Sequence, residues 1–237
     1  MKLLLPKQHG AWAMLLVPFL LGIGAGQASL IHIPLLIGWF FLYLATYPLL
    51  MVIKNKRKQL HIKWSFIYLI PAMVSLAVVL IMEPRLIYFG LALFPLFLIN
   101  IYFSRTNNER ALLNDFSAII NFSIGGAASY YAGMGSIDQL AVVLSVFTIL
   151  FFVGSTFFVK TMIREKRNSI YKWVSWGFHG SIIIALLILG YPLFIFAYLP
   201  SLVRAIYLYG KKISTMKMGI IEIVNSVYFF VIILILL

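Results

Sequence analysis

The chain has 237 residues, of which 63% are apolar and only 11% are charged. So little polar surface cannot cover a water-soluble globule, so the composition predicts an all-α integral membrane protein. The absence of cysteine excludes disulfide bonds, thiolate zinc sites and cysteine nucleophiles. A formal net charge of +13 would suggest nucleic-acid binding in a soluble protein. In a membrane protein it reflects Lys and Arg retained in cytoplasmic loops, so we expect no nucleic-acid partner.

Glycine, proline and charged residues divide the chain into nine apolar segments, and a bilayer span needs about 20 apolar residues. The segments are residues 11–28, 30–53, 64–82, 85–103, 111–133, 137–159, 170–189, 191–209 and 219–237. The connections between them are too short to hold a soluble domain. We therefore expect a single transmembrane domain over residues 1–237.

Basic residues predict the orientation of this domain. If the N-terminus is cytoplasmic, every Lys and Arg except Arg85 falls on the cytoplasmic side. Cytoplasmic loops of membrane proteins are enriched in these two residue types. We therefore expect nine transmembrane helices, with the N-terminus in the cytoplasm and the C-terminus outside.

Polar side chains concentrate between the fourth and fifth expected helices. If the fourth helix continues, Arg105 and Glu109 lie four residues apart on one face, and the arginine could hold forked donors ready for an anion. Asn108 and Asp115 are seven residues apart and would share a face as well. The candidate anion-binding residues here are Arg105, Asn108, Glu109, Arg110, Asn114 and Asp115.

Two further stretches are expected at the same cytoplasmic level. Lys160, Arg164 and Asn168 recur every four residues, which predicts a second polar stripe below the sixth helix. At the start of the first helix, Gln8, His9 and the free helix amides could contact an anion, and His9 could carry a proton near neutral pH. The alternative for His9 is an interfacial anchor beside a tryptophan.

Together these stretches predict a cationic cup that binds a phosphate, a diphosphate or a lipid carboxylate, with the lipid tail between helices. The candidates for a catalytic role in it are His9, Glu109, Asp115 and Glu165. Ion pairing with a neighbouring arginine is the alternative role for the three acids.

Two ionisable residues lie within expected spans, which makes each a candidate for function. They are His179 and Glu222, and they suggest a different class of protein, a permease or exporter that uses them as coupling groups. The alternatives are a neutral, hydrogen-bonded ring at His179 and snorkelling of Glu222 toward the surface near Lys217. An assembly protein within a membrane complex is also left open.

Three stretches, residues 6–14, 105–115 and 160–168, resemble the YwiC-like family of bacterial membrane proteins. More distantly, nine helices with polar segments after the even-numbered ones resemble the UbiA superfamily of intramembrane prenyltransferases. That resemblance implies a ring of nine helices around a lipid-facing cavity, a polyprenyl or other lipid phosphate as ligand, and prenyl transfer as a possible activity. It also implies a multi-pass protein of the bacterial cytoplasmic membrane with membrane lipids as partners.

The sequence departs from the UbiA pattern at the metal site. UbiA enzymes carry aspartate-rich motifs after helices 2 and 6, and these aspartates hold Mg²⁺ against the diphosphate. The segment 54–58 contains no acid, and the segment after the sixth helix keeps only Glu165. We therefore expect no metal or other cofactor, and a lipid-phosphate site in which cations take the place of Mg²⁺.

Overall fold

The computed structural model describes residues 4–6 and 9–237, with the backbone alone at His9. Within these residues all regular structure is helical and no strand occurs. The chain divides into two compact units, residues 1–145 and residues 146–237. The expectation of one transmembrane domain over residues 1–237 stays a prediction.

Nine α-helices occupy the nine expected segments of the described chain, which confirms the predicted number of helices. They are α1 (His9–Ala25), α2 (His32–Ile53), α3 (Lys58–Met82), α4 (Ile87–Arg105), α5 (Leu112–Met134), α6 (Gln139–Val159), α7 (Ser169–Ile188), α8 (Ile195–Tyr207) and α9 (Thr215–Leu236). Three short elements extend them, namely the 3₁₀-helix η1 (Pro84–Leu86), the π-helix η2 (Lys160–Arg164) and the 3₁₀-helix η3 (Pro192–Phe194).

The predicted start of the third helix at residue 64 is wrong, because α3 begins at Lys58. Arg57 adopts a left-handed conformation with φ of 41°, and His61 Nδ1 lies 2.6 Å from the carbonyl oxygen of Lys56. His61 thereby connects the α2–α3 loop to the first turn of α3. Lys58 and Lys63 thus lie in the helix, while Lys54, Lys56 and Arg57 form the turn before it.

Within residues 4–6 and 9–237, six helical stretches are long and apolar enough to cross a membrane. They are His32–Ile53, Lys58–Met82, Pro84–Arg105, Gln139–Arg164, Ser169–Ile188 and Thr215–Leu236. The stretches at α1 and α8 are apolar but shorter, and α5 is not among the six. The chain is therefore a multi-pass membrane protein by length and composition, and the number of nine spans stays a prediction.

Helix α5 is less apolar because it lies in the interior of the first unit. It contacts α1, α2 and α4, and its buried positions include Ser117, Ser123 and Ser129. The hydroxyl of Ser129 donates to the carbonyl oxygen of Phe19 in α1 at 2.9 Å. Small and polar side chains are suited to contacts between membrane helices, where a neighbouring helix supplies their partners.

Small residues lie at the contact between α1 and α5. A Cβ atom added at Gly22 would stand 2.4 Å from the backbone oxygen of Gly126, and one added at Gly126 would stand 2.7 Å from the backbone oxygen of Pro18. Only a hydrogen atom fits at either position. Helices α1 and α5 therefore approach each other backbone to backbone at these glycines.

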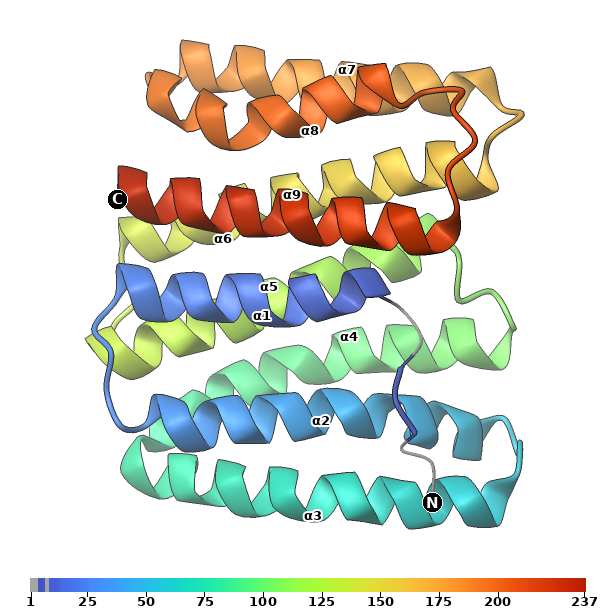
Figure 1. The fold of residues 1–237 in the computed structure, drawn as a ribbon. Helices are drawn as coiled ribbons and strands as arrows, with labels where there is room; N and C mark the ends of the chain where they lie inside the picture. The colour runs from blue at the N-terminus through green and yellow to red at the C-terminus, as the bar shows by residue number, and fades with distance from the viewer. Residues whose placement is uncertain (1–3, 7–8) are drawn as a thin grey trace. The chain divides into compact units, whose positions relative to one another are not determined.

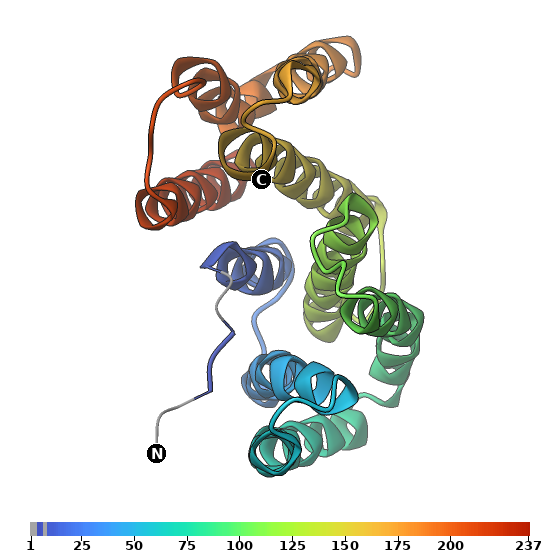
Figure 2. The ribbon, with the colours of Figure 1, turned by 90° about the vertical axis from the view of Figure 1, so that its right-hand side faces the viewer.

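In the first unit, the α2–α3 and α4–α5 connections lie at one end and the α3–α4 connection at the other (Figure 1). Figure 2 looks toward the first of these ends, which we call the basic end of the first unit. It carries Lys54, Lys56, Arg57, Lys58, Arg105 and Arg110. The opposite end carries Arg85, next to Glu83. Antiparallel helices thus gather on one side the cations that are scattered along the sequence.

The second unit consists of the C-terminal part of α6 together with α7, α8 and α9. Helix α8 contacts both α7 and α9, and Phe151 of α6 stacks on Phe229 of α9 with ring centroids 4.1 Å apart. The α6–α7 and α8–α9 connections lie at one end (Figure 1), the basic end of this unit. Its cations are Lys160, Arg164, Lys166, Arg167, Lys172, Lys211, Lys212 and Lys217, while Arg204 lies further inside, in α8.

Candidate functional site

The polar stretch between α4 and α5 is a turn and not a continued helix. Helix α4 ends at Arg105, Asn107 adopts a left-handed conformation with φ of 53°, and α5 begins at Leu112. The predicted pairing of Arg105 with Glu109 on one helical face is therefore wrong. The same break means that Asn108, in the turn, and Asp115, in the first turn of α5, do not share a helical face.

Glu109 instead forms an ion pair with Lys54 at the end of α2. The lysine side chain is only 7% exposed, whereas that of Glu109 is 38% exposed. The Lys54 ammonium lowers the pKa of the Glu109 carboxyl below its ordinary value, so this carboxylate stays ionised at neutral pH. Glu109 therefore acts as a charge partner that joins the α2–α3 and α4–α5 turns, and its candidate catalytic role stays a prediction.

A chain of hydrogen bonds holds the α4–α5 turn in place. The amide of Asn114 donates to the carbonyl oxygen of Glu109 at 2.8 Å, and the hydroxyl of Ser117 donates to that of Asn114 at 2.9 Å. Asn100 of α4 then donates to the Ser117 hydroxyl at 3.3 Å. Asn114 is a predicted anion-binding residue, but its side-chain amide holds the turn together. Arg105, Asn108 and Arg110 are exposed around the turn.

The Lys54–Glu109 pair makes a pH-dependent contribution to stability. Because the pKa of Glu109 is lower in the folded protein, the contribution is present above the ordinary value of 4.5 and is lost as pH falls through the folded pKa. We expect Glu109→Gln to cost about 1 kcal/mol at pH 7, since the pair is partly exposed. The cost should fade toward pH 3. Thermal unfolding of wild type and variant across this range measures it, and a cost that does not change with pH would contradict the assignment.

The second polar stretch does not form a single stripe either. Lys160 is only 6% exposed and lies in η2, which ends at Arg164. Asn168 belongs to the next element, because its side-chain oxygen caps α7 by accepting the N–H of Ile170 at 3.1 Å. The predicted spacing of four residues therefore does not place Lys160, Arg164 and Asn168 on one helical face.

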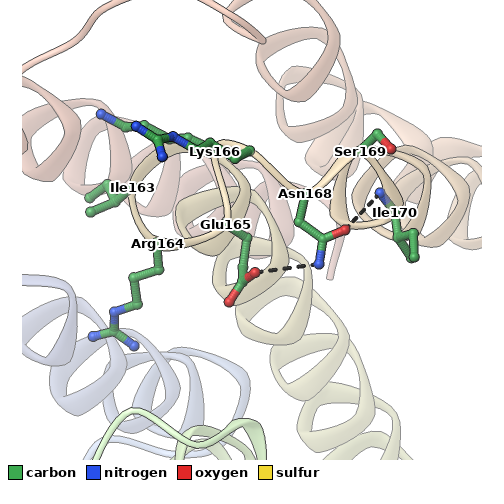
Figure 3. A pocket seen from close by; sticks show the side chains of 8 residues that line it. Ile163, Arg164, Glu165, Lys166, Asn168, Ser169 and Ile170 are labelled. Atoms are coloured by element: carbon green, nitrogen blue, oxygen red, sulfur yellow. Dashed lines mark hydrogen bonds between the residues drawn. The ribbon is translucent and has the colours of Figure 1, made fainter.

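An open hollow of about 560 Å³ lies at the α6–α7 turn. It is lined by residues 163–170 and includes Arg164, Lys166 and Arg167. In Figure 3, Arg164 and Lys166 point in different directions, while Glu165 turns toward Asn168. The amide of Asn168 donates to Glu165 at 3.4 Å. Three cations and the start of α7 line the hollow together with one carboxylate, so its lining favours an anion.

Several predicted site residues are not brought together by what the structure describes. Gln8 and the side chain of His9 lie outside the described residues. The two polar stretches belong to different units, so the cup that would combine them stays a prediction. Among the described side chains, no group of three or more His, Asp or Glu residues is placed to hold a metal ion.

The second unit contains a buried ion pair that the sequence reveals only in part. Glu222 of α9 pairs with Arg204 of α8, and these residues are 6% and 7% exposed. The expected snorkelling of Glu222 toward Lys217 is therefore wrong. Sequence reasoning singled out Glu222 but read Arg204 only as a cytoplasmic charge, since nothing in the spacing of the two residues predicts their contact.

His179 is a buried, hydrogen-bonded ring, and its neutral state stays a prediction. It is 3% exposed, and its Nδ1 lies 2.7 Å from the carbonyl oxygen of Ser175. A carbonyl oxygen only accepts, so Nδ1 carries the proton. The Nε2 atom is buried without a hydrogen-bond partner.

Comparison with known proteins identifies relatives along almost the full chain. A model of the family described as YwiC-like protein matches residues 5–130. A Bacillus subtilis (strain 168) protein, described as uncharacterized protein YwiC, is 44% identical over 229 residues, which cover 97% of this chain and 96% of the relative. A Haemophilus influenzae protein, described as uncharacterized protein, is 40% identical over 237 residues, covering 99% of each chain.

No solved structure matches the chain. The resemblance to the UbiA superfamily stays a prediction. The family model covers more than half of the chain, and both relatives are similar over nearly all of it. The chain therefore belongs to the YwiC-like family.

Proposed function

We propose that this protein binds the phosphate or diphosphate group of an anionic isoprenoid or other lipid at the hollow of its α6–α7 turn and at the cationic turns of the first unit. In this proposal all nine helices span the bacterial cytoplasmic membrane and the basic ends face the cytoplasm. Cytoplasmic loops are where Lys and Arg accumulate in membrane proteins. The lipid tail would lie along the apolar surface of the helices.

The observation that carries the proposal is the hollow at the α6–α7 turn. Arg164, Lys166 and Arg167 line it together with a single carboxylate, Glu165. Guanidinium and ammonium groups bind phosphate oxygens through charge-assisted hydrogen bonds, which are about twice as strong as neutral ones. The start of α7 adds the positive end of a helix dipole.

The basic end of the first unit adds a second cationic surface. Its one carboxylate in the α4–α5 turn, Glu109, is already neutralised by Lys54. Lys56, Arg57 and Lys58 are exposed beside it, and segment 54–58 contains no acid. Such a surface attracts anionic lipid headgroups.

Farnesyl diphosphate is a suitable probe for the hollow, and its binding to purified protein in mild detergent can be titrated by native mass spectrometry. We expect Lys166→Ala/Arg167→Ala to weaken binding by about tenfold or more, because each lost charge-assisted contact contributes about 1.5–3 kcal/mol. The matched control is Lys211→Ala/Lys212→Ala, which removes two adjacent exposed cations from the same end of the same unit.

The affinity of this control for farnesyl diphosphate should be within about twofold of the wild-type affinity. For comparison, a tenfold change in affinity corresponds to about 1.4 kcal/mol. Equal affinity in wild type and both double variants would overturn the proposal. Adding Mg²⁺ tests the metal site that the UbiA resemblance implies. We expect Mg²⁺ not to raise the affinity for farnesyl diphosphate, because Mg²⁺ requires carboxylate ligands. Segment 54–58 contains no acid, and the α6–α7 turn contains only Glu165. A Mg²⁺-dependent loss of diphosphate from the probe would instead support prenyl transfer.

A further inference from the structure

The buried ion pair of the second unit is part of a layer of polar side chains. Arg204 Nη2 donates to the hydroxyl of Ser155 on α6 at 2.9 Å, besides pairing with Glu222. One turn further along α9, Asn225 donates to Ser201 of α8 at 2.9 Å. All five side chains are buried, and we call them the polar layer. Three helices contribute to it, so it crosses the interior of the unit.

Apolar side chains close the polar layer on both sides. Toward the basic end lies a buried cluster of Phe158, Met162, Ala205 and Met218, in which the Phe158 ring lies 4.6 Å from the Arg204 guanidinium. Toward the other end lies an aromatic cluster of Phe147, Phe151, Tyr198 and Phe229. The polar layer is therefore flanked by apolar side chains toward both ends of the unit.

Arg204 is not fully satisfied within this layer. Its Nε atom is buried and faces no hydrogen-bond acceptor, and the Nη1 atom lacks a well-aligned hydrogen bond, although it forms the ion pair with Glu222. Replacing a buried ion pair by apolar residues is often neutral or stabilising. Stability alone therefore gives little reason to bury these charges. Ionisable residues inside membrane helices are candidates for function by default.

We propose that the polar layer is an exchange site at which a small monocarboxylate replaces the Glu222 carboxylate on Arg204 while Glu222 takes up a proton. The proton is taken from hydronium in the bulk solvent, which becomes water, and it ends on a carboxylate oxygen of Glu222, which leaves the guanidinium. The carboxylate of the incoming anion then pairs with Arg204. Before and after the exchange, the buried guanidinium faces one negative charge, so no unpaired charge is left in the interior.

The chemistry of the layer limits the ligand. A guanidinium presents planar, forked donors that match a carboxylate, which is the group that Glu222 already offers. The ligand has to be small, because Phe158 packs against the guanidinium on one side and the Phe151–Phe229 stack closes the other. The site makes no use of the cationic turns, so it does not depend on the function proposed above.

Other titratable groups near the layer have to be separated from Glu222. Among the described residues of this unit, His179, Lys160 and Tyr198 are also buried. His179 packs against Gly154, the residue before Ser155, with its Nε2 atom 3.0 Å from where a Cβ would stand. Tyr198 donates its hydroxyl to the carbonyl oxygen of Phe147 at 2.7 Å, and Lys160 lies beyond Phe158, in η2.

Acetate is the probe for the test, because it is the smallest simple analogue of a glutamate side-chain end. The full-length protein in mild detergent is titrated with sodium acetate at pH 6, 7 and 8 and constant ionic strength, and thermal unfolding reports the apparent Kd. One proton is taken up with each anion, so we expect the affinity to fall by about tenfold per pH unit. Proton uptake is measured independently as the pH change of a weakly buffered sample on addition of acetate.

Variants identify the group that takes the proton. Glu222→Gln imitates the protonated acid, so its acetate affinity should be the same at all three pH values. Glu83→Gln, the same substitution in the other unit, should keep the wild-type slope. If Glu222→Gln keeps that slope, the proton goes to another group such as His179 and the proposal fails.

An acetate affinity of wild type that does not change with pH, or the absence of any acetate-dependent shift, would also overturn the proposal. If Glu222→Gln does not fold, the wild-type slope and the measured proton uptake decide by themselves.

Discussion

Arg204→Met is expected to destabilise the second unit by about 3–5 kcal/mol, because it leaves the buried Glu222 carboxylate without its cation. Methionine fills much of the volume of the arginine stem, so the loss reports the charge rather than a cavity. Thermal unfolding in detergent, followed by tryptophan fluorescence, measures the change. Trp173 and Trp176 both lie on α7 of the same unit, where they report its unfolding.

The double variant Arg204→Met/Glu222→Leu separates the loss of one partner from the loss of the pair. It replaces the ion pair by apolar side chains, which is often neutral or stabilising in a buried site. We therefore expect it to recover most of the stability and to lose acetate binding. Lys211→Met, at an exposed position, is the matched control. If Arg204→Met is no less stable than this control, the buried pair does not form.

Gly22→Ala is expected to cost about 3 kcal/mol, at the upper end of the usual penalty for overpacking. The added Cβ would stand 2.4 Å from the backbone oxygen of Gly126 and 2.8 Å from the backbone nitrogen of Tyr130. Both obstacles are backbone atoms of α5, so no side-chain rotation can relieve them. Helices α1 and α5 would have to move apart, and the hydrogen bond from Ser129 to Phe19 would be lost.

Gly90→Ala provides the control for this substitution. Gly90 lies in α4 of the same unit, and a Cβ there would have no neighbour within 4 Å. The Gly90→Ala variant should be as stable as wild type or slightly more stable, because alanine is a better helix former than glycine. Equal unfolding temperatures for the two alanine variants would mean that α1 and α5 are not packed as closely as the structure has them.

The sequence predicted the helices well because the signals for them are local. Apolar runs of about 20 residues set the length of a span, and charged or glycine-containing segments separate one run from the next. The predicted start of the third helix was wrong because of another local group. His61 contacts the carbonyl oxygen of Lys56, and this contact holds the turn that precedes α3. Basic segments follow every second helix along the chain, because consecutive helices run antiparallel.

Predictions within the polar turns failed because they assumed continued helices. The spacing of Arg105 and Glu109 is typical of a pair on one helical face, but the left-handed Asn107 ends that helix between them. Asn168 likewise starts α7 rather than ending α6. A spacing rule holds only while the backbone keeps its period, and short polar turns interrupt that period.

The amino-acid sequence by itself determined the class of protein, the number of its helices and the end of each unit at which its cations gather. These properties follow from composition and from the local order of apolar and charged residues. Only the tertiary structure decided which charges meet. Lys54 and Glu109 are 55 residues apart in the chain, and Glu222 reaches Arg204 on another helix rather than the neighbouring Lys217. A buried charge takes its partner from whichever helix packs against it, and helix packing is set by side-chain shape and not by spacing.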